Sequence, residues 1–351
     1  MFAEYRKEFM ANKEVTIYDI AKQLKLSAST VSRALNENKL INENTRNRVI
    51  AYAEGIGYQT NTFASNLRSQ STKTIGVIVP KLDSKFISSC LAGAEKVAAE
   101  KGYNLLISQT LEDFEKEKKD AKALFKKRVD GLLISLSRNS ETLTHLKPFF
   151  DKGIPVLFFD RTPEGTTYSS YLIDNFEAAY KATKHLIDNG CKELTHITLK
   201  SCLSVFSQRE RGFKQAIADA NLSSLGQVIH LDQLNLKSGK EVAGRITLAS
   251  TDGVFCANDQ AAMGCMSELL KRGIRIPGDI AFVGFNNEPF CDLISPSLTT
   301  VNYPAFEMGT LVTNHLVEHI LGNSNINLTN KTLLKSELVI RESSLKTRNN
   351  E

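Results

Sequence analysis

From Thr74 onward, short runs of apolar residues alternate with longer stretches that have the spacing of amphipathic helices. Continuously apolar strands of this kind occur in parallel sheets that helices cover on both faces. The runs form two successive sets, at 74–80, 103–108, 129–135 and 154–160, and at 194–199, 226–231, 252–258 and 279–285. Helices are expected between them, for example at 86–101 and 113–128. The pattern predicts two doubly wound α/β lobes, each with roughly four or five strands.

In sheets of this type, ligands bind beyond the carboxyl ends of the strands. Polar residues that end the apolar runs are therefore candidates for a binding site. These residues are Asp160, Asn258, Asp259, Asn286 and Asn287.

Residues 15–56 have a different pattern, with apolar residues at helical spacing. Three stripes are visible, formed by Ile17, Ile20, Ala21 and Leu24, by Val31, Ala34 and Leu35, and by Val49, Ile50 and Ala53. Ser27 is the expected N-cap of the second helix, and Asn42 or Asn44 that of the third. The pattern predicts a bundle of three short helices.

The second of these helices has an outer face of small polar residues and one arginine, Arg33. Small hydroxyl side chains can approach base edges closely in the major groove of DNA. The excess positive charge lies in the same region, since residues 1–73 hold 11 Lys/Arg against 7 Asp/Glu and the rest hold 33 against 32. Both features favour binding to nucleic acid. The alternatives are a solvated helix in an ordinary bundle and a basic, disordered N-terminus.

Composition narrows the class of protein. With 42% hydrophobic and 24% charged residues, the 351-residue chain can bury a large core. Neither a secretory signal nor an apolar run of about 18 residues is found, so we expect a cytoplasmic protein without a membrane partner. The six cysteines lack zinc spacing, which predicts no metal and no cofactor. Three common catalytic motifs, the phosphate-binding loop, H-E-x-x-H and G-x-S-x-G, are missing, and we expect no catalytic residue.

The stretch VTIYDIAKQLKLSASTVSRALNENKLINENTRNRVIAYAEGIGY resembles the helix-turn-helix DNA-binding domain of the lactose/galactose repressor family. The resemblance implies that Ala28, Ser29 and Arg33 read base edges. It implies contacts mainly with the DNA backbone for Thr16, Tyr18, Ser27, Thr30, Ser32 and Asn36.

The segment TNTFASNL resembles the hinge helix of the same family, with Thr60 where proline is usual. On this reading, Leu67 enters the minor groove as an apolar wedge and Ala64 packs near it. The alternative is a plain flexible linker.

Residues 74–343 resemble the effector domain of the family, which has the fold of periplasmic sugar-binding proteins. The resemblance rests on RERGFKQAI, VFCANDQAAMGCM, KRGIRIPGDIAFVGF and SPSLTTVNYPAFEMG. It implies a small-molecule effector between the lobes, a carbohydrate, in contact with Phe86, Asp160, Arg209, Leu234, Asn258 and Asn286.

Several alternatives stay open for this site. Asp160 and Arg209 could instead form a structural salt bridge across the lobes, and Phe86 could belong to the core. Asn286 stands where the family commonly has aspartate, so a purine-like or phosphorylated effector is a second possibility, which Lys85 would favour.

These patterns predict a repressor whose operator affinity is controlled by the effector. It would act as a homodimer on a near-palindromic operator. Residues after Ile340 carry no apolar heptads, so no coiled coil is expected to join two dimers. A sugar-binding transport protein is the competing class, and the helix-turn-helix segment argues against it.

The expected domains follow from these patterns. They are a disordered extension (1–14), a helix-turn-helix domain (15–60), a hinge helix or linker (61–73), an effector-binding and dimerisation domain (74–345) and a tail (346–351). The two lobes of the effector domain are expected at about 74–172 with 303–333, and at 173–302 with 334–345.

Overall fold

The computed structural model divides the chain into two compact units, residues 1–70 and 71–351. The structure describes residues 15–35, 38, 40–58, 71–222, 226–328 and 330–346. The expected extension, most of the hinge segment and nearly all of the tail lie outside these ranges, as do Asn36, Ala64 and Leu67.

The first unit contains the three predicted short helices, α2 (Ile17–Leu24), α3 (Ala28–Leu35) and α4 (Glu43–Gly55). Its small core forms where Ile20, Val31 and Val49 meet, each of them fully buried. The prediction of a three-helix bundle from the apolar stripes is confirmed.

Polar side chains set the ends of these helices. Before α2, the backbone N–H of Thr16 donates to the Asp19 carboxylate at 2.9 Å. Lys25 follows α2 with a positive φ of 53° and turns the chain toward α3. Ser27 accepts a hydrogen bond from the backbone of Thr30 at 3.1 Å, and Asn42 accepts one from Asn44 at 2.9 Å. The contacts of Ser27 and Asn42 agree with the expected caps.

The second unit is built on two six-stranded sheets, and the first runs in the order β11-β5-β4-β3-β1-β2. All of its strand pairs are parallel. The strands are β1 (Thr74–Val79), β2 (Asn104–Gln109), β3 (Gly131–Ile134), β4 (Val156–Phe159), β5 (Ser170–Ile173) and β11 (Lys331–Leu334). With its helices, this sheet is called lobe 1 below.

The second sheet runs in the order β12-β10-β9-β8-β6-β7 and forms lobe 2 with its helices. Only β12, at its edge, runs antiparallel to its neighbour. The strands are β6 (Leu194–Leu199), β7 (Gln227–Leu231), β8 (Gly253–Cys256), β9 (Ala281–Asn286), β10 (Thr299–Asn302) and β12 (Glu337–Val339).

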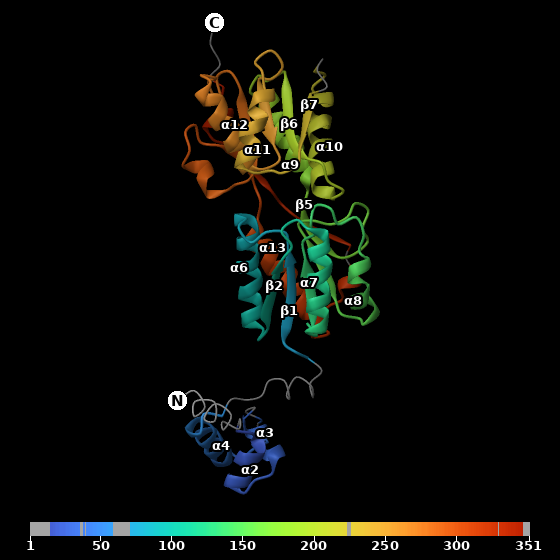
Figure 1. The fold of residues 1–351 in the computed structure, drawn as a ribbon, viewed down its shortest axis with the longest axis vertical. Helices are drawn as coiled ribbons and strands as arrows, with labels where there is room; N and C mark the ends of the chain where they lie inside the picture. Colours follow the sequence, from blue (N-terminus) through green and yellow to red (C-terminus); the bar gives the residue numbers. More distant parts are fainter. Residues whose placement is uncertain are drawn as a thin grey trace, which may run out of the picture. The chain divides into compact units, whose positions relative to one another are not determined.

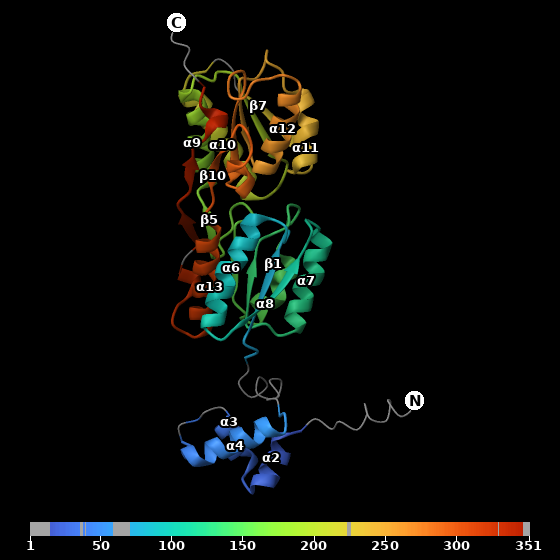
Figure 2. The same ribbon diagram turned by 90° about the vertical axis from the view of Figure 1, so that its left-hand side faces the viewer.

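Helices cover both faces of each sheet (Figures 1 and 2). In lobe 1, α6 (Lys85–Glu100) and α13 (Ala305–Ile320) pack on one face. The other face carries α7 (Phe114–Lys126) and α8 (Lys147–Asp151). In lobe 2, the paired helices are α9 (Asn175–Asp188) with α10 (Ser204–Asp219), and α11 (Leu236–Val242) with α12 (Asp259–Lys271). The predicted doubly wound architecture is confirmed.

Short 3-10 helices complete the described elements. They are η1 (Thr144–Leu146), η2 (Ala243–Arg245), η3 (Pro289–Asp292), η4 (Ile326–Leu328) and η5 (Glu342–Ser344). Among the described residues, no helix is both long enough and apolar enough to cross a membrane.

The chain passes between the two lobes at three points. It leaves lobe 1 after β5, returns after β10 to begin α13, and leaves again between β11 and β12 (Figures 1 and 2). Residues 303–334 therefore complete lobe 1, although they follow lobe 2 in the sequence.

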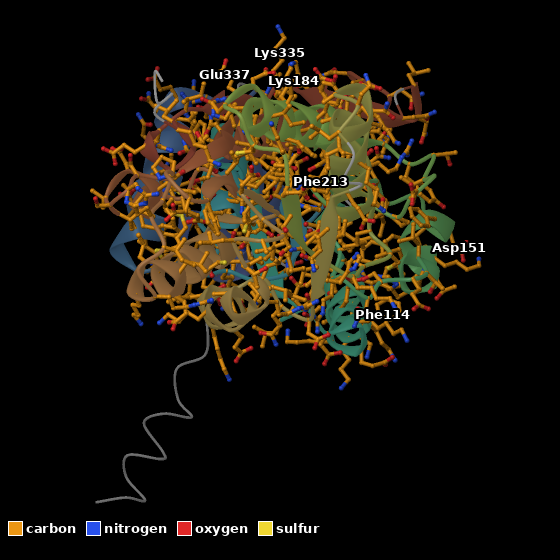
Figure 3. All side chains as sticks on the ribbon, turned by 90° about the horizontal axis from the view of Figure 1, so that it is seen from above. Phe114, Asp151, Lys184, Phe213, Lys335 and Glu337 are labelled. Atoms are coloured by element: carbon orange, nitrogen blue, oxygen red, sulfur yellow. The ribbon has the colours of Figure 1, made fainter. Side chains whose placement is uncertain are left out.

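His196, on β6, is fully buried between the rings of Phe213 and Phe255. Its Nδ1–H donates to the carbonyl of Phe255 at 2.9 Å, and its Nε2 has no partner among the described residues. Phe213 lies inside the unit, whereas Lys184 and Glu337 lie at its surface (Figure 3). Burial lowers the pKa of His196 to about 4.

Because the pKa of His196 is lowered, we expect the protein to lose stability in weak acid. The pKa of His196 in the folded protein lies below that of a histidine in the unfolded chain. As the pH falls below ~6.5, the unfolded chain therefore binds a proton that the folded protein does not, and the stability present above this pH is lost progressively until the pH reaches about 4. We expect His196 to lower the free energy of unfolding by about 2 kcal/mol between pH 7.5 and 5. Urea unfolding of the parent and of His196→Phe across this pH range measures the change in the free energy of unfolding. An equally steep pH dependence in the variant would contradict it.

Candidate functional site

The first unit presents a hydroxyl-rich surface at the start of α3. The Ser27 hydroxyl lies 2.8 Å from the hydroxyls of both Ser29 and Thr30. Because Val31 and Ala34 face the core, Ser29 and Arg33 on the other side of the helix are exposed. The helix therefore offers small hydroxyl groups and one cation to a partner.

The other predicted DNA-contacting residues in the described ranges are at least partly accessible. Tyr18, near the start of α2, is 71% exposed, Thr16 and Ser27 are exposed, and Ala28, Thr30 and Ser32 are half-buried. Asn36, Ala64 and Leu67 lie outside the described residues. Contact with DNA stays a prediction for each of them.

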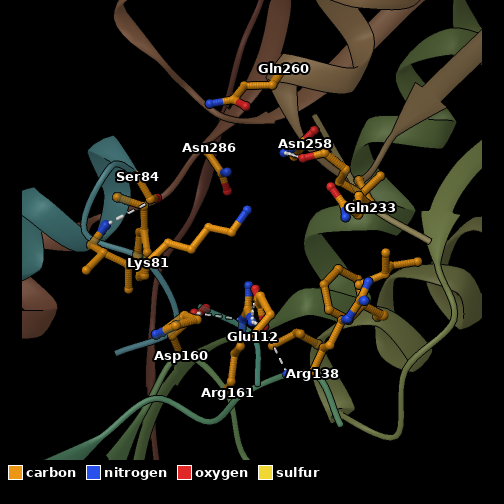
Figure 4. Close-up of a pocket in the computed structure, with 18 of the residues that line it drawn as sticks. Lys81, Ser84, Glu112, Arg138, Asp160, Arg161, Gln233, Asn258, Gln260 and Asn286 are labelled. Carbon is orange, nitrogen blue, oxygen red and sulfur yellow. Dashed lines mark hydrogen bonds and ion pairs between the residues drawn. The ribbon is translucent and has the colours of Figure 1, made fainter. Parts of the chain in front are cut away.

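The second unit contains a pocket of about 240 Å³ between the two lobes. This volume holds a small organic molecule rather than a single water. The walls come from the carboxyl ends of strands in both sheets, where parallel-sheet proteins bind ligands. Figure 4 shows polar side chains from both lobes around the open centre. The lining includes Pro80, Lys81, Asp83, Ser84, Phe86, Ile87, Leu111, Glu112, Arg138, Asp160, Arg161, Leu199, Val205, Phe206, Arg209, Gln233, Leu234, Ala257, Asn258, Gln260, Asn286 and Glu288.

All six residues predicted to contact an effector line this pocket: Phe86, Asp160, Arg209, Leu234, Asn258 and Asn286. They come from segments up to 200 residues apart in the sequence. Their binding role stays a prediction.

Asp160 follows β4 and is only 7% exposed. Its carboxylate accepts hydrogen bonds from the Tyr303 hydroxyl at 3.0 Å and the Ser135 hydroxyl at 3.4 Å. Its Oδ2 lies 3.6 Å from Nε of Arg161. Burial raises the pKa of Asp160, although Arg161 and Arg209 act in the opposite direction.

Arg209, on α10, is 5% exposed and makes its hydrogen bonds to neutral groups. Its Nε donates to the Asn175 side chain and its Nη1 to the carbonyl of Ala257, each at 2.8 Å. The guanidinium lies 3.5 Å from the centroid of the Phe285 ring. Burial lowers its pKa to about 10, so it remains a cation at neutral pH. Since no ion pair joins Asp160 to Arg209 among the described residues, the expected alternative of a salt bridge across the lobes is wrong.

Two further predicted residues serve both the pocket and the structure around it. Phe86 packs edge-on against Tyr303 with ring centroids 4.3 Å apart, and it belongs to the buried core. Asn258 caps α12 by accepting from the backbone of Ala261 at 2.9 Å, and it donates to the carbonyl of Leu234 at 3.1 Å. Each of these two side chains therefore has a structural role and also lines the pocket.

The charged residues that follow the strands of lobe 1 were not among the predicted site residues. Lys81 follows β1, Glu112 follows β2, Arg138 follows β3 and Arg161 follows β4, and all four line the pocket. The strand-end rule that selected Asp160 would also have selected these residues, had it been applied to every strand. By contrast, Lys85 is exposed and does not line the pocket.

Asp259 and Asn287 also end apolar runs, yet neither lines the pocket. The buried Asp259 carboxylate accepts from the Thr300 hydroxyl at 2.6 Å and from the backbone of Glu288 at 2.9 Å. Asn287 accepts from Arg341 at 2.9 Å. Both side chains tie strand ends together within lobe 2. The described residues contain no group of three or more His, Cys, Asp or Glu that could hold a metal ion.

Comparison with known proteins decides the family. Residues 16–61 match the family described as bacterial regulatory proteins, lacI family, and residues 183–344 match a periplasmic binding protein-like domain. The HTH-type transcriptional regulator RegA of Clostridium saccharobutylicum is 31% identical over 333 residues, which cover 94% of this chain and 99% of that protein. The chain belongs to the lacI family of bacterial regulatory proteins. It is a DNA-binding transcriptional regulator.

Two further proteins place this lacI-family regulator among its relatives. The HTH-type transcriptional repressor PurR of Aliivibrio fischeri (strain MJ11) is 32% identical over 310 residues, covering 87% of this chain and 91% of that protein. The fold is shared with the lac repressor dimer solved with operator and the anti-inducer ONPF, at a TM-score of 0.83 and 22% identity. That match covers 95% of this chain and all of the solved chain.

Loss of the Arg33 side chain is expected to reduce the discrimination of this lacI-family regulator between operator and random DNA. Replacing Arg33 by alanine should weaken operator binding by about 1–3 kcal/mol and leave binding to random DNA unchanged, as expected for a contact with a base edge. Fluorescence anisotropy on both DNAs measures the ratio. Arg48→Ala, an exposed arginine on α4, is the matched control and should keep the parental ratio. Equal losses on both DNAs for Arg33→Ala would assign Arg33 to a phosphate.

Proposed function

We propose that the protein is a homodimeric, cytoplasmic transcriptional repressor whose affinity for a near-palindromic operator depends on a small polar effector. The helix-turn-helix unit, at 15–60, would read half of the operator in each subunit. Residues 61–73 would act as the hinge, and residues 74–345 would bind the effector and dimerise. The shared family with regulators and repressors of similar length supports this assignment.

The observation that carries the proposal is the pocket between the lobes. Its polar side chains come from both sheets, with Asp160 from lobe 1 and Arg209, Asn258 and Asn286 from lobe 2. A ligand that contacts both lobes binds one angle between them more tightly than others. Ligand binding then shifts the population of that angle, which is the physical requirement for control at a distance.

A carbohydrate is the effector class that we favour. Carboxylate, guanidinium and amide groups in one pocket match the donors and acceptors of a polyhydroxylated molecule. Phe86 and Phe206 add aromatic surface for an apolar sugar or nucleobase face. A purine-like molecule is the alternative.

Three measurements test the proposed function. Selection from random-sequence DNA with the full-length protein should return a near-palindromic site, and light scattering should give a dimer at micromolar concentration. A panel of sugars and nucleobases should then contain a compound that raises the melting temperature and also changes operator affinity. The direction of that change distinguishes an inducer from a co-repressor. A monomer without sequence preference, or operator affinity that no panel member alters, would contradict the proposal.

A further inference from the structure

The charged groups of the pocket are not evenly neutralised. The lining contains four cations, Lys81, Arg138, Arg161 and Arg209, and four carboxylates, Asp83, Glu112, Asp160 and Glu288. Equal numbers suggest a neutral site. The hydrogen-bond partners of each group change this result.

Three of the four carboxylates already have donors from the protein. Glu112 accepts from Arg161 at 2.9 Å and from the backbone of Arg138 at 3.0 Å. Although burial acts against it, Arg161 holds the pKa of Glu112 below its usual value. Asp160 is satisfied as described above, and Glu288 accepts from the backbone of Lys85. Asp83 is exposed at the edge of the pocket.

Three of the four cations have no carboxylate partner. Arg209 uses its donors on Asn175 and Ala257, whereas Lys81 and Arg138 keep unused donors. Lys81 makes no hydrogen bond or ion pair with any described residue, although its charge helps Arg161 to lower the pKa of Glu112. Figure 4 shows its ammonium group pointing into the open centre of the pocket. Arg138 donates through Nη1 to the backbone carbonyl of Asp232 in lobe 2, while its buried Nε has no partner among the described residues. Arg161, by contrast, is paired with Glu112.

The backbone adds to this positive potential. The first turns of α6, α10 and α12 all contribute to the lining, through Ser84, Phe206 and Gln260 among others. Helix N-termini carry partial positive charge and favour anions. Glu288 takes a backbone donor at α6, so it offsets part of this contribution.

Besides Arg209 and Glu288, lobe 2 contributes a group of neutral amides to the pocket. Gln233, Asn258, Gln260 and Asn286, all from lobe 2, face Lys81 across the centre (Figure 4). Amides donate and accept hydrogen bonds without charge, which suits hydroxyl or heterocyclic groups. The pocket therefore has a cationic side and an amide side.

We propose that the effector is an anion: a small hydroxyl-bearing molecule whose carboxylate or phosphate group lies between Lys81 and Arg138. The amides of lobe 2 bind its neutral part. This inference rests on the proposed effector-responsive function and narrows the ligand to a sugar acid, a sugar phosphate or a nucleotide. Because Arg138 already reaches lobe 2 through Asp232, an anion bound here also stabilises a contact between the lobes.

The test uses sets of compounds that share a carbon skeleton and differ in whether they carry a carboxylate or a phosphate group. One set is glucose, gluconate and glucose 6-phosphate, a second is ribose, ribonate and ribose 5-phosphate, and a third is inosine and inosine monophosphate. Calorimetric titration of the full-length protein, free of DNA, gives each Kd at two salt concentrations. We expect an anionic member of at least one set to bind at least tenfold more tightly than its neutral counterpart. The carboxylate and phosphate arms identify which anion is used.

Lys81→Met and Lys85→Met make the assignment specific. Lys81 has no described partner, so its loss should leave folding intact, and Lys85 is an exposed neighbour outside the pocket. Lys81→Met should reduce the preference for the anion at least fivefold, and Lys85→Met should keep it. Tighter binding of the neutral members, or an unchanged preference in Lys81→Met, would overturn the anionic class and leave the effector function standing. No binding by any compound, together with unaltered operator affinity, would count against the effector function itself.

Discussion

Replacing Gly309 by valine is expected to lower the free energy of unfolding of residues 71–351 by about 3 kcal/mol, because added side-chain atoms at a closely packed contact force the backbones apart. A Cβ atom at position 309, on α13, would lie 1.8 Å from the carbonyl oxygen of Cys90 on α6. A Cβ atom at Gly93, on α6, would in turn lie 2.1 Å from the carbonyl oxygen of Phe306. The two helices thus touch through glycines on both sides (Figure 2).

This contact also bears on the pocket. Phe86 lies in the first turn of α6, and Tyr303, which hydrogen-bonds Asp160, lies just before α13. Forcing the helices apart should therefore disturb the wall that both residues form. Effector affinity should fall with stability in Gly309→Val.

Urea unfolding followed by circular dichroism measures the effect. Gly244→Ala is the matched control, since a Cβ atom there would meet nothing within 4 Å and its φ is not in the left-handed region. We expect a change of less than ~0.5 kcal/mol for the control. A parental unfolding midpoint in Gly309→Val would show that α6 and α13 do not pack as closely as described.

Replacing Arg209 by methionine is expected to raise the effector concentration needed for half-maximal response about 10- to 100-fold, because a charged hydrogen bond is worth about 1.5–3 kcal/mol. Methionine keeps an apolar stem against Phe206 and Phe285 but removes the donors that reach Asn175 and Ala257. The variant should also lose about 1–3 kcal/mol of stability from the acceptors left unpaired.

Arg211→Met separates a pocket effect from a general effect on α10. Arg211 lies two residues further along the same helix and is exposed. Its variant should respond like the parent, and both variants should keep operator affinity without effector within a few fold. A folded Arg209→Met protein that responds at parental concentrations would remove Arg209 from the effector site.

The eight strands with continuous apolar runs could be predicted from the sequence, and β5, β10, β11 and β12 could not. β1 and β6 each present five or six buried residues in a row. β5 has only four residues, SYLI, and β11 alternates between exposed and half-buried positions because it lies at a sheet edge. Such strands are specified by their neighbours rather than by local pattern. For this reason each sheet has six strands rather than four or five.

The same limit applies to the pocket. Resemblance placed Asp160, Arg209 and Asn258 correctly on its wall, and the ends of strands were the right place to look. Which charged side chains form ion pairs, however, depends on contacts in the folded structure. Sequence spacing could not show that Glu112 pairs with Arg161 while Lys81 forms no ion pair. Residues 112 and 161 meet only because the carboxyl ends of β2 and β4 lie at the same end of the sheet.

The three passages of the chain between the lobes have a consequence for how the protein is made. The sheet of lobe 1 is completed by β11 and that of lobe 2 by β12, and Ser343 then donates to the carbonyl of Phe282 inside lobe 2. On the ribosome, neither sheet can therefore be finished until residues 331–344 have left the exit tunnel, although most strands of lobe 1 emerge first. During synthesis, both β5 and β10 keep an open edge, the feature through which strands of different chains pair and aggregate. The lobes are thus expected to mature together, once residues 331–344 are available, rather than one after the other.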